Sequence, residues 1–99
     1  MRTLLQVELD TTTSNQLMAE GRIDELMNNV LGQLKPEAAY FFPLNGRRCM
    51  FLVVDLADEA SIVTAVEPFW NQANATVTVV PCMNAEDLKT GIGRYLASR

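Results

Sequence analysis

The chain has 99 residues, 48% of them hydrophobic, and a formal net charge of −4 at pH 7. The length fits one domain spanning residues 1–99, and the acidic balance argues against nucleic acid as a partner, because nucleic acids bind basic surfaces. Histidine is absent, which excludes a Ser-His-Asp or Cys-His triad and a haem held by a proximal histidine.

Two further features bear on where the protein works. No apolar run reaches the roughly 20 residues of a membrane span, and residues 1–9 alternate instead of forming the apolar region of a signal peptide. Cys49 and Cys82 match no zinc or redox spacing, so both are expected to be free, buried thiols. We therefore expect a cytoplasmic protein that does not bind membranes.

The first element in the chain is a predicted strand from Thr3 to Asp10. Apolar residues alternate along it, with one face formed by Leu5, Val7 and Leu9 and the other by Leu4, Gln6 and Glu8. A helical pattern follows, and Thr13 with Gln16 fits a capping box at its start. The apolar stripe of this helix comprises Ile23, Met27, Val30 and Leu34.

Gly21 falls inside this helical pattern, and Leu17 and Met18 lie off the main stripe. Because glycine is a poor helix former, either the helix is broken there or Leu17 and Met18 cover something other than the main core. These two side chains are expected either to line the mouth of a pocket or to pack against the C-terminal helix.

The pair Asn45-Gly46 predicts a β-hairpin in the middle of the chain. It lies between Tyr40–Leu44 and Cys49–Leu56, and a tight type I′ turn needs positive φ at both central residues. Pro43 cannot donate a hydrogen bond to a ladder, which predicts that the first strand is at an edge of the sheet. The second strand is apolar on both faces and is expected to be central.

The remainder of the chain predicts a helix, a strand and a final helix. Asp58 is the predicted cap of the first of these helices, and Pro68 is expected to kink or restart it. The strand runs from Ala75 to Cys82, and Asn84 with Asp87 fits a capping box for a short C-terminal helix.

The β-α-β-β-α-β order predicts a ferredoxin-like α+β sandwich with an antiparallel sheet in the order 4-1-3-2. Two crossover helices cover only one face of such a sheet. The centre of the other face is too apolar to remain in water, so a second copy is expected to cover it in a homodimer. This open face comprises Leu4, Gln6, Glu8, Cys49, Phe51, Val53, Asp55, Thr76, Thr78 and Val80.

The run Val66–Pro81, VEPFWNQANATVTVVP, is a helix with proline and aromatics that leads directly into a V-x-V strand. Together with the element order, it resembles the dimeric α/β-barrel superfamily, which includes muconolactone isomerase-like and antibiotic-biosynthesis-monooxygenase-like small proteins. The resemblance implies dimers paired sheet to sheet and a ligand cavity between sheet and helices. Several members use no metal or cofactor. Others need histidine, which this chain lacks, so no catalytic residue is transferred.

Residue type and predicted placement provide the catalytic candidates. Glu8 and Asp55 lie on central strands, where each is either a desolvated base or a rim partner of an arginine. Tyr40 is a hydrogen-bond donor to a ligand or an interface residue. We predict no metal and no cofactor, because adjacent acidic residues such as Asp24-Glu25 diverge on a helix.

The candidate ligand-binding residues are Trp70, Leu17, Met18 and Arg48. Trp70 is either a ligand-stacking wall or a core residue near the end of its helix. Arg47-Arg48 is the only adjacent basic pair, and it is either a solvated strand end or a contact for an anion or carboxylate.

Three classes of function remain open. The first is a homodimeric protein that binds a small apolar or aromatic molecule without catalysis. The second is a cofactor-independent isomerase or monooxygenase acting on such a molecule, which a closed apolar cavity with one convergent carboxylate or tyrosine would favour. The third is a non-catalytic regulatory or assembly module that uses the C-terminal helix for interaction.

Overall fold

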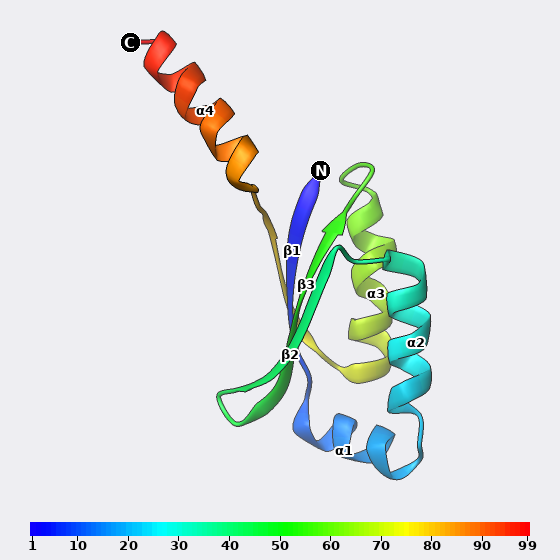
Figure 1. Ribbon diagram of the computed structural model, residues 1–99. Helices are drawn as coiled ribbons and strands as arrows, with labels where there is room; N and C mark the ends of the chain where they lie inside the picture. The colour runs from blue at the N-terminus through cyan, green and yellow to red at the C-terminus, as the bar shows by residue number, and fades with distance from the viewer.

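The computed structural model describes residues 1–99 as a four-stranded antiparallel sheet with three of its four helices packed on one face (Figure 1). The elements in chain order are β1 (Arg2–Glu8), α1 (Thr11–Ala19), α2 (Ile23–Leu34), β2 (Ala38–Leu44), β3 (Arg47–Asp55), α3 (Ser61–Ala73), β4 (Thr76–Pro81) and α4 (Ala85–Ala97). The sheet order is β2-β3-β1-β4, which is the predicted order 4-1-3-2 counted from the other edge. The predicted α+β class and strand order are confirmed.

The β2–β3 hairpin has the predicted two-residue turn. Asn45 and Gly46 have φ values of 55° and 74°, and Leu44 pairs with Arg47 across the turn. Positive φ at both central positions defines a type I′ turn, whose twist matches that of the flanking strands. The turn therefore sets the register of β2 against β3, and through it the faces to which Phe41 and Arg48 belong.

Replacing Gly46 with alanine is expected to destabilise the protein by about 1–2 kcal/mol, because a Cβ is unfavourable at positive φ. A Cβ at this position would meet no atom within 4 Å, so the cost comes from the backbone alone. Gly32→Ala in α2 is the matched control, since its Cβ also meets nothing within 4 Å and alanine favours a helix by about 1 kcal/mol. Urea unfolding should therefore shift in opposite directions for the two variants.

The region after β1 forms two helices instead of one. Gly21 adopts a φ of 68° between α1 and α2. Of the two predicted alternatives, the structure therefore has the broken helix. The predicted capping box at Thr13 and Gln16 is wrong, because α1 begins earlier and its N-cap is Asp10. The Asp10 carboxylate accepts hydrogen bonds from the Thr13 amide (3.0 Å) and hydroxyl (2.8 Å), so Thr13 lies within the helix.

Helix α3 departs from the prediction in two details. Its N-cap is Ala60, and Asp58 accepts a hydrogen bond from the Ser61 amide at 2.9 Å without being the cap residue. Pro68 lies inside the helix and does not end it. Thr64, whose carbonyl loses its partner at Pro68, is exposed, so water can bond to that carbonyl in place of the amide.

The core lies between the sheet and the helices α1, α2 and α3. Strands β1 and β3 contribute fully buried side chains such as Leu5 and Leu52, which pair across the ladder, and α3 contributes Phe69. Val63 and Trp70 lie on the outer side of α3 and are exposed, as their position at the margin of the helical stripe indicates. This core fixes which face of each strand is available elsewhere.

The opposite sheet face has no helix over it. The register pairs Leu4 with Val53 and with Val80, so these three side chains share that face. The rings of Phe42 and Phe51 meet edge to face there, with centroids 4.7 Å apart. The register confirms that all ten residues predicted for the open face lie on this surface.

Both cysteines are free, as predicted. The two cysteines are separated by β1 and lie near opposite ends of the sheet. Cys49 pairs with Glu8 at one end of β1, whereas the Cys82 amide donates to the Arg2 carbonyl at the other end. Cys49 is buried, while Cys82 is half-buried.

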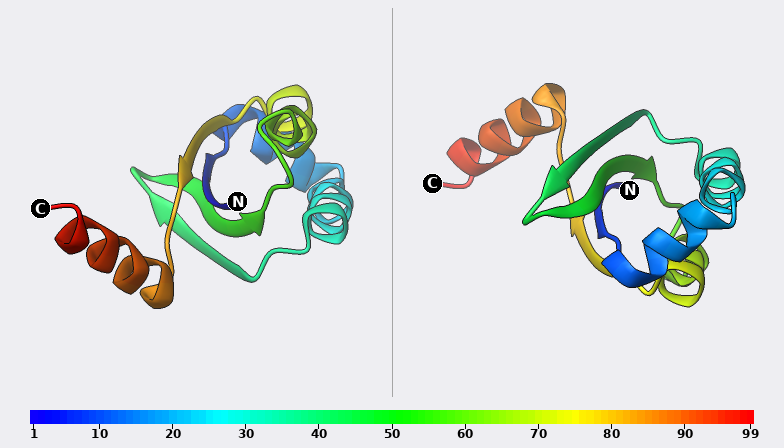
Figure 2. Two further views of the ribbon diagram at one scale, coloured as in Figure 1. Left: turned by 90° about the horizontal axis from the view of Figure 1, so that it is seen from above. Right: turned by 90° about the horizontal axis from the view of Figure 1, so that it is seen from below.

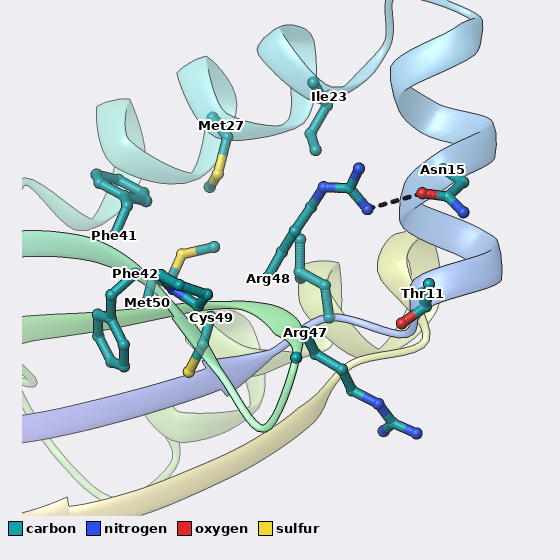
Figure 3. Close-up of a pocket in the computed structure, with 13 residues that line it drawn as sticks. Thr11, Asn15, Ile23, Met27, Phe41, Phe42, Arg47, Arg48, Cys49 and Met50 are labelled. Carbon is teal, nitrogen blue, oxygen red and sulfur yellow. Dashed lines mark hydrogen bonds between the residues drawn. The ribbon is translucent and has the colours of Figure 1, made fainter.

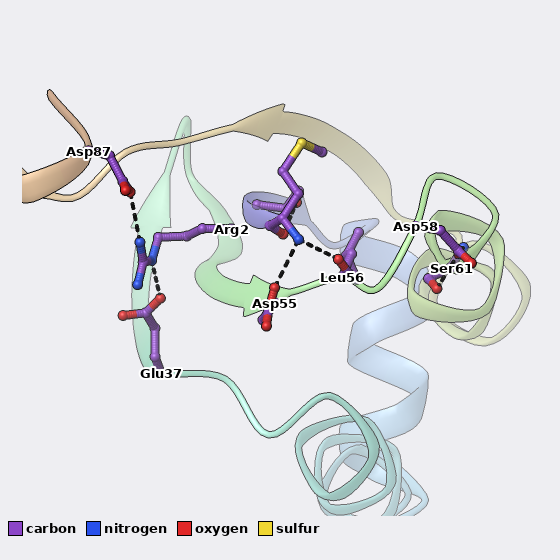
Figure 4. Close-up of polar contacts among 9 residues, drawn as sticks. Arg2, Glu37, Asp55, Leu56, Asp58, Ser61 and Asp87 are labelled. Carbon is purple, nitrogen blue, oxygen red and sulfur yellow. Dashed lines mark hydrogen bonds and ion pairs between the residues drawn. The ribbon is translucent and has the colours of Figure 1, made fainter. Parts of the chain in front are cut away.

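Helix α4 projects away from the rest of the protein and gives the molecule its longest dimension, 57 Å (Figures 1 and 2). The predicted Asn84–Asp87 capping box is present, and every residue of the helix is exposed. Arg2 of β1 donates to Asp87 at 3.0 Å and also pairs with Glu37 (Figure 4). None of the four helices is long and apolar enough to cross a membrane.

Candidate functional site

A pocket of about 760 Å³ lies where the β2–β3 hairpin faces α1 and α2 (Figure 3). Its volume falls within the roughly 300–1,000 Å³ typical of sites for small molecules. The hairpin extends beyond the helices that cover the middle of the sheet (Figure 1). Of its helix-facing residues, Met50 is buried, whereas Phe41 and Arg48 remain exposed at the pocket.

The walls of the pocket are mainly apolar. Ile23 and Met27 approach from α2, and Phe41 and Met50 approach from paired positions on β2 and β3 (Figure 3). Phe41 points to the same side as the buried Met50, yet 56% of it remains exposed. The protein itself therefore leaves this large aromatic ring partly uncovered on the helix-facing side, as expected for a surface that contacts a ligand.

The principal polar group at this wall is the guanidinium of Arg48. Its Nη1 donates to Ser14 Oγ at 2.8 Å and to Asn15 Oδ1 at 2.9 Å. Ser14 is fully buried, and its hydroxyl donates in turn to the Thr11 carbonyl. The charge is thus held against α1 by two neutral acceptors, at the rim of an apolar cavity (Figure 3).

Arg47 also lines the pocket, but its charge is directed elsewhere. It pairs with Glu8 across the open face, with Nη1 and Oε1 3.4 Å apart. Arg48, in contrast, forms no ion pair with any carboxylate of the chain. No aspartate or glutamate is among the 13 lining residues, so the pocket has a net positive charge.

The cap of α1 stabilises the segment that holds Arg48, and it responds to pH. Hydrogen bonds from the backbone amide and then the hydroxyl of Thr13 lower the pKa of Asp10. The contribution of this carboxylate is therefore fully present above its unfolded pKa of about 3.9 and is lost as the pH falls through the lower folded pKa.

Asp10→Asn is expected to make stability less sensitive to acid, because asparagine can cap a helix but does not titrate. The urea midpoint of this variant should fall less than that of the wild type between about pH 5 and pH 2. Glu59→Gln is the control, since Glu59 is an exposed carboxylate that forms no ion pair. An equal fall in wild type and Asp10→Asn would contradict the prediction.

The structure does not bring the three catalytic candidates together. Glu8 lies on the open face beside Arg47, and Tyr40 lies on the same face opposite Phe51. Asp55 is at the other end of β3, where its side chain is 89% exposed and accepts a hydrogen bond from the N-terminal ammonium at 2.9 Å (Figure 4). That hydrogen bond lowers the pKa of Asp55, the opposite of what a base near neutral pH needs.

Of the four candidate ligand-binding residues, Arg48 alone lines the pocket. Leu17 is buried in the core, and Met18 beside it is exposed; α4 lies far from both (Figure 1). Trp70 is 48% exposed on the outer side of α3 and is neither a core residue nor part of the pocket wall.

Cys49 borders the pocket, but its buried thiol lies on the open-face side of β3, beside Glu8 and Phe42 (Figure 3). Burial raises its pKa, which keeps the sulfur protonated and weakly nucleophilic at neutral pH. No group of three or more cysteine, aspartate or glutamate side chains converges as metal ligands would.

Sequence reasoning missed the apolar walls, namely Ile23, Met27, Phe41 and Met50. Strand alternation held one usable signal. Arg48, Met50 and Leu52 are alternate residues of β3 and therefore share one face of the strand. A charged side chain was thus predictable on the helix-facing side of a central strand.

No model of a known protein family matches this chain, and no curated protein matches it in sequence.

Proposed function

We propose that the protein is a small homodimer that binds a small apolar or aromatic molecule in the pocket between α1, α2 and the hairpin. The observation that carries this proposal is Phe41, an aromatic side chain that faces the helix layer but remains more than half exposed. An apolar ligand stacked on this ring would also contact Met27 and Met50, whose flexible thioethers adapt to irregular shapes.

The nature of the polar groups favours binding over catalysis. An isomerase or monooxygenase would need a base or a proton donor beside the ligand. Neither a carboxylate nor a tyrosine lines this pocket, and Glu8, Asp55 and Tyr40 lie on the open face. A fixed arginine and asparagine serve to orient a ligand, which is what a binding protein requires.

Fluorescence of N-phenyl-1-naphthylamine, a neutral apolar dye, tests the proposal directly. The wild-type protein is expected to enhance its emission saturably, and Phe41→Ser is expected to weaken binding about tenfold, because it removes an aromatic wall. Trp70→Ser is the matched control, since it deletes an exposed aromatic outside the pocket. Absence of saturable binding to the wild type, or an equal loss in both variants, would contradict the proposal.

The homodimer is proposed on the apolar character of the open face. No layer covers the open-face side chains of Phe42, Phe51, Val53 and Val80. An antiparallel sheet with one solvated face normally has polar side chains on that face, so these apolar side chains are unusual there. A second copy is the occupant we propose, because one twofold operation covers both open faces at once. Such a pair is the arrangement of a dimeric α/β barrel.

A second candidate function, a regulatory or assembly role, is favoured by α4. Its exposed apolar side chains form one stripe, comprising Leu88, Ile92, Tyr95 and Leu96. Gly91 and Gly93 weaken the helix, and an isolated helix of 13 residues is marginal in water, so we expect it to dock on another surface.

Ile92→Lys separates the two functions. If α4 serves assembly, this variant should change the oligomeric state in light scattering while the dye still binds the pocket. If it also abolishes dye binding in a folded protein, α4 and the pocket are not independent.

A further inference from the structure

Arg48 is the only arginine of the pocket wall whose charge no carboxylate balances. Arg47 next to it is paired with Glu8, so the two arginines that appear equivalent in the sequence have different environments. Ser14 and Asn15 accept hydrogen bonds from Arg48 but carry no charge. The pocket thus presents one unbalanced positive charge beside an apolar wall.

The hydrogen bonds of Arg48 leave a defined part of the guanidinium free. Both protein acceptors use Nη1, whereas Nε and Nη2 donate to no protein atom. Nε and Nη2 lie along one edge of the planar group and point their N–H bonds in parallel. This edge matches the two oxygens of a carboxylate, which can accept both hydrogen bonds at once.

The free edge is also held in place. An arginine side chain loses considerable rotamer entropy when it is fixed, and this loss opposes binding if it occurs on ligand capture. Here the buried Ser14 hydroxyl and the Asn15 amide fix the guanidinium through Nη1 before any ligand arrives. Ser14 and Asn15 are therefore positioning residues.

We infer that the ligand of this pocket is a monocarboxylate with an apolar or aromatic body. This inference rests on the proposed binding function and specifies its ligand class. The carboxylate is bound by the Nε–Nη2 edge of Arg48, and the apolar body lies against Phe41, Met27 and Met50. Arg48 is exposed at the rim of the pocket, and its single positive charge matches the single negative charge of a carboxylate, whereas a phosphate dianion would keep one negative charge that this arginine does not balance.

The test compares three naphthalene derivatives of matched size by isothermal titration calorimetry: 1-naphthoate, its neutral amide 1-naphthamide and 1-naphthyl phosphate. Each is titrated into the full-length wild type, Arg48→Gln and Arg47→Gln. Each variant loses one positive charge, and the two residues are adjacent, but the charge of Arg47 is already paired with Glu8. The thermal unfolding midpoint of each variant establishes that it is folded.

The expected result is that 1-naphthoate binds the wild type about ten- to hundredfold more tightly than 1-naphthamide, the range for a charge-assisted hydrogen bond. Arg48→Gln should abolish this preference while still binding the amide, and Arg47→Gln should retain the preference. Ser14→Ala should reduce it severalfold, since the guanidinium is then less fixed.

Equal affinity of the wild type for the naphthoate and the amide would overturn the carboxylate inference and leave the binding function in place. A preference that survives in Arg48→Gln, or tighter binding of the phosphate than of the naphthoate, would overturn it as well. Failure of all three compounds to bind the wild type would overturn both the inference and the proposed function.

Discussion

Phe51→Glu is expected to convert the proposed homodimer into a monomer. Phe51 is at the centre of the open face, where it pairs with Gln6 on one side and Tyr40 on the other. Burying an unpaired carboxylate between two apolar sheet faces costs several kcal/mol, so dimer affinity should fall by about a thousandfold or more. Sedimentation equilibrium at micromolar protein measures the change directly.

Val63→Glu is the matched control for this experiment. Val63 is an exposed apolar residue on the outer side of α3, so the substitution adds the same charge to a surface outside the proposed interface. The control should remain dimeric and Phe51→Glu should be monomeric and folded. A wild type that is already monomeric at micromolar concentration would contradict the proposed dimer.

The largest loss of stability is expected for Phe69→Ala. The Phe69 side chain is fully buried between α3 and the sheet, and deleting such a ring leaves a cavity at a cost of about 3–5 kcal/mol. This is a large share of the roughly 5–15 kcal/mol that stabilises a small domain. Urea unfolding should show this loss, and it is measured at one fixed protomer concentration because the proposed dimer would make stability depend on concentration.

Trp70→Ala offers a comparison at the adjacent position. The indole is about half exposed and outside both the core and the pocket, so its removal should cost less than about 1 kcal/mol. Similar losses for the two variants would mean that α3 packs with a different face towards the sheet.

The parts of the fold that the sequence predicts are those set by local chemistry. Asn45-Gly46 determines the turn type, the turn determines the register, and alternation then assigns every side chain of β3 to a face. The start of α1 was predicted incorrectly because two cap signals lie three residues apart. Asp10 prevails over Thr13, since its carboxylate receives both the amide and the hydroxyl of that threonine.

The candidate site was less predictable, because it depends on where packing stops. Alternation places Phe41 on the helix-facing side, but no local pattern indicates that α2 leaves this ring uncovered. Tryptophan is a large aromatic residue and therefore an obvious ligand wall, yet Trp70 points away from the sheet because Val66 and Phe69 occupy the inner side of the same helix. Pocket walls arise from the distance between elements, which the sequence does not encode locally.

Each edge strand of the sheet contains a proline, Pro43 in β2 and Pro81 in β4. Because proline has no backbone N–H, a strand from another molecule would lack one hydrogen-bond donor at either edge. This disfavours the stepwise growth of a continuous intermolecular sheet. In contrast, pairing through the open face gives a closed dimer, because it leaves no open face for a third chain. We therefore expect concentrated solutions to stay free of amyloid-like fibres even though much of the sheet surface is apolar.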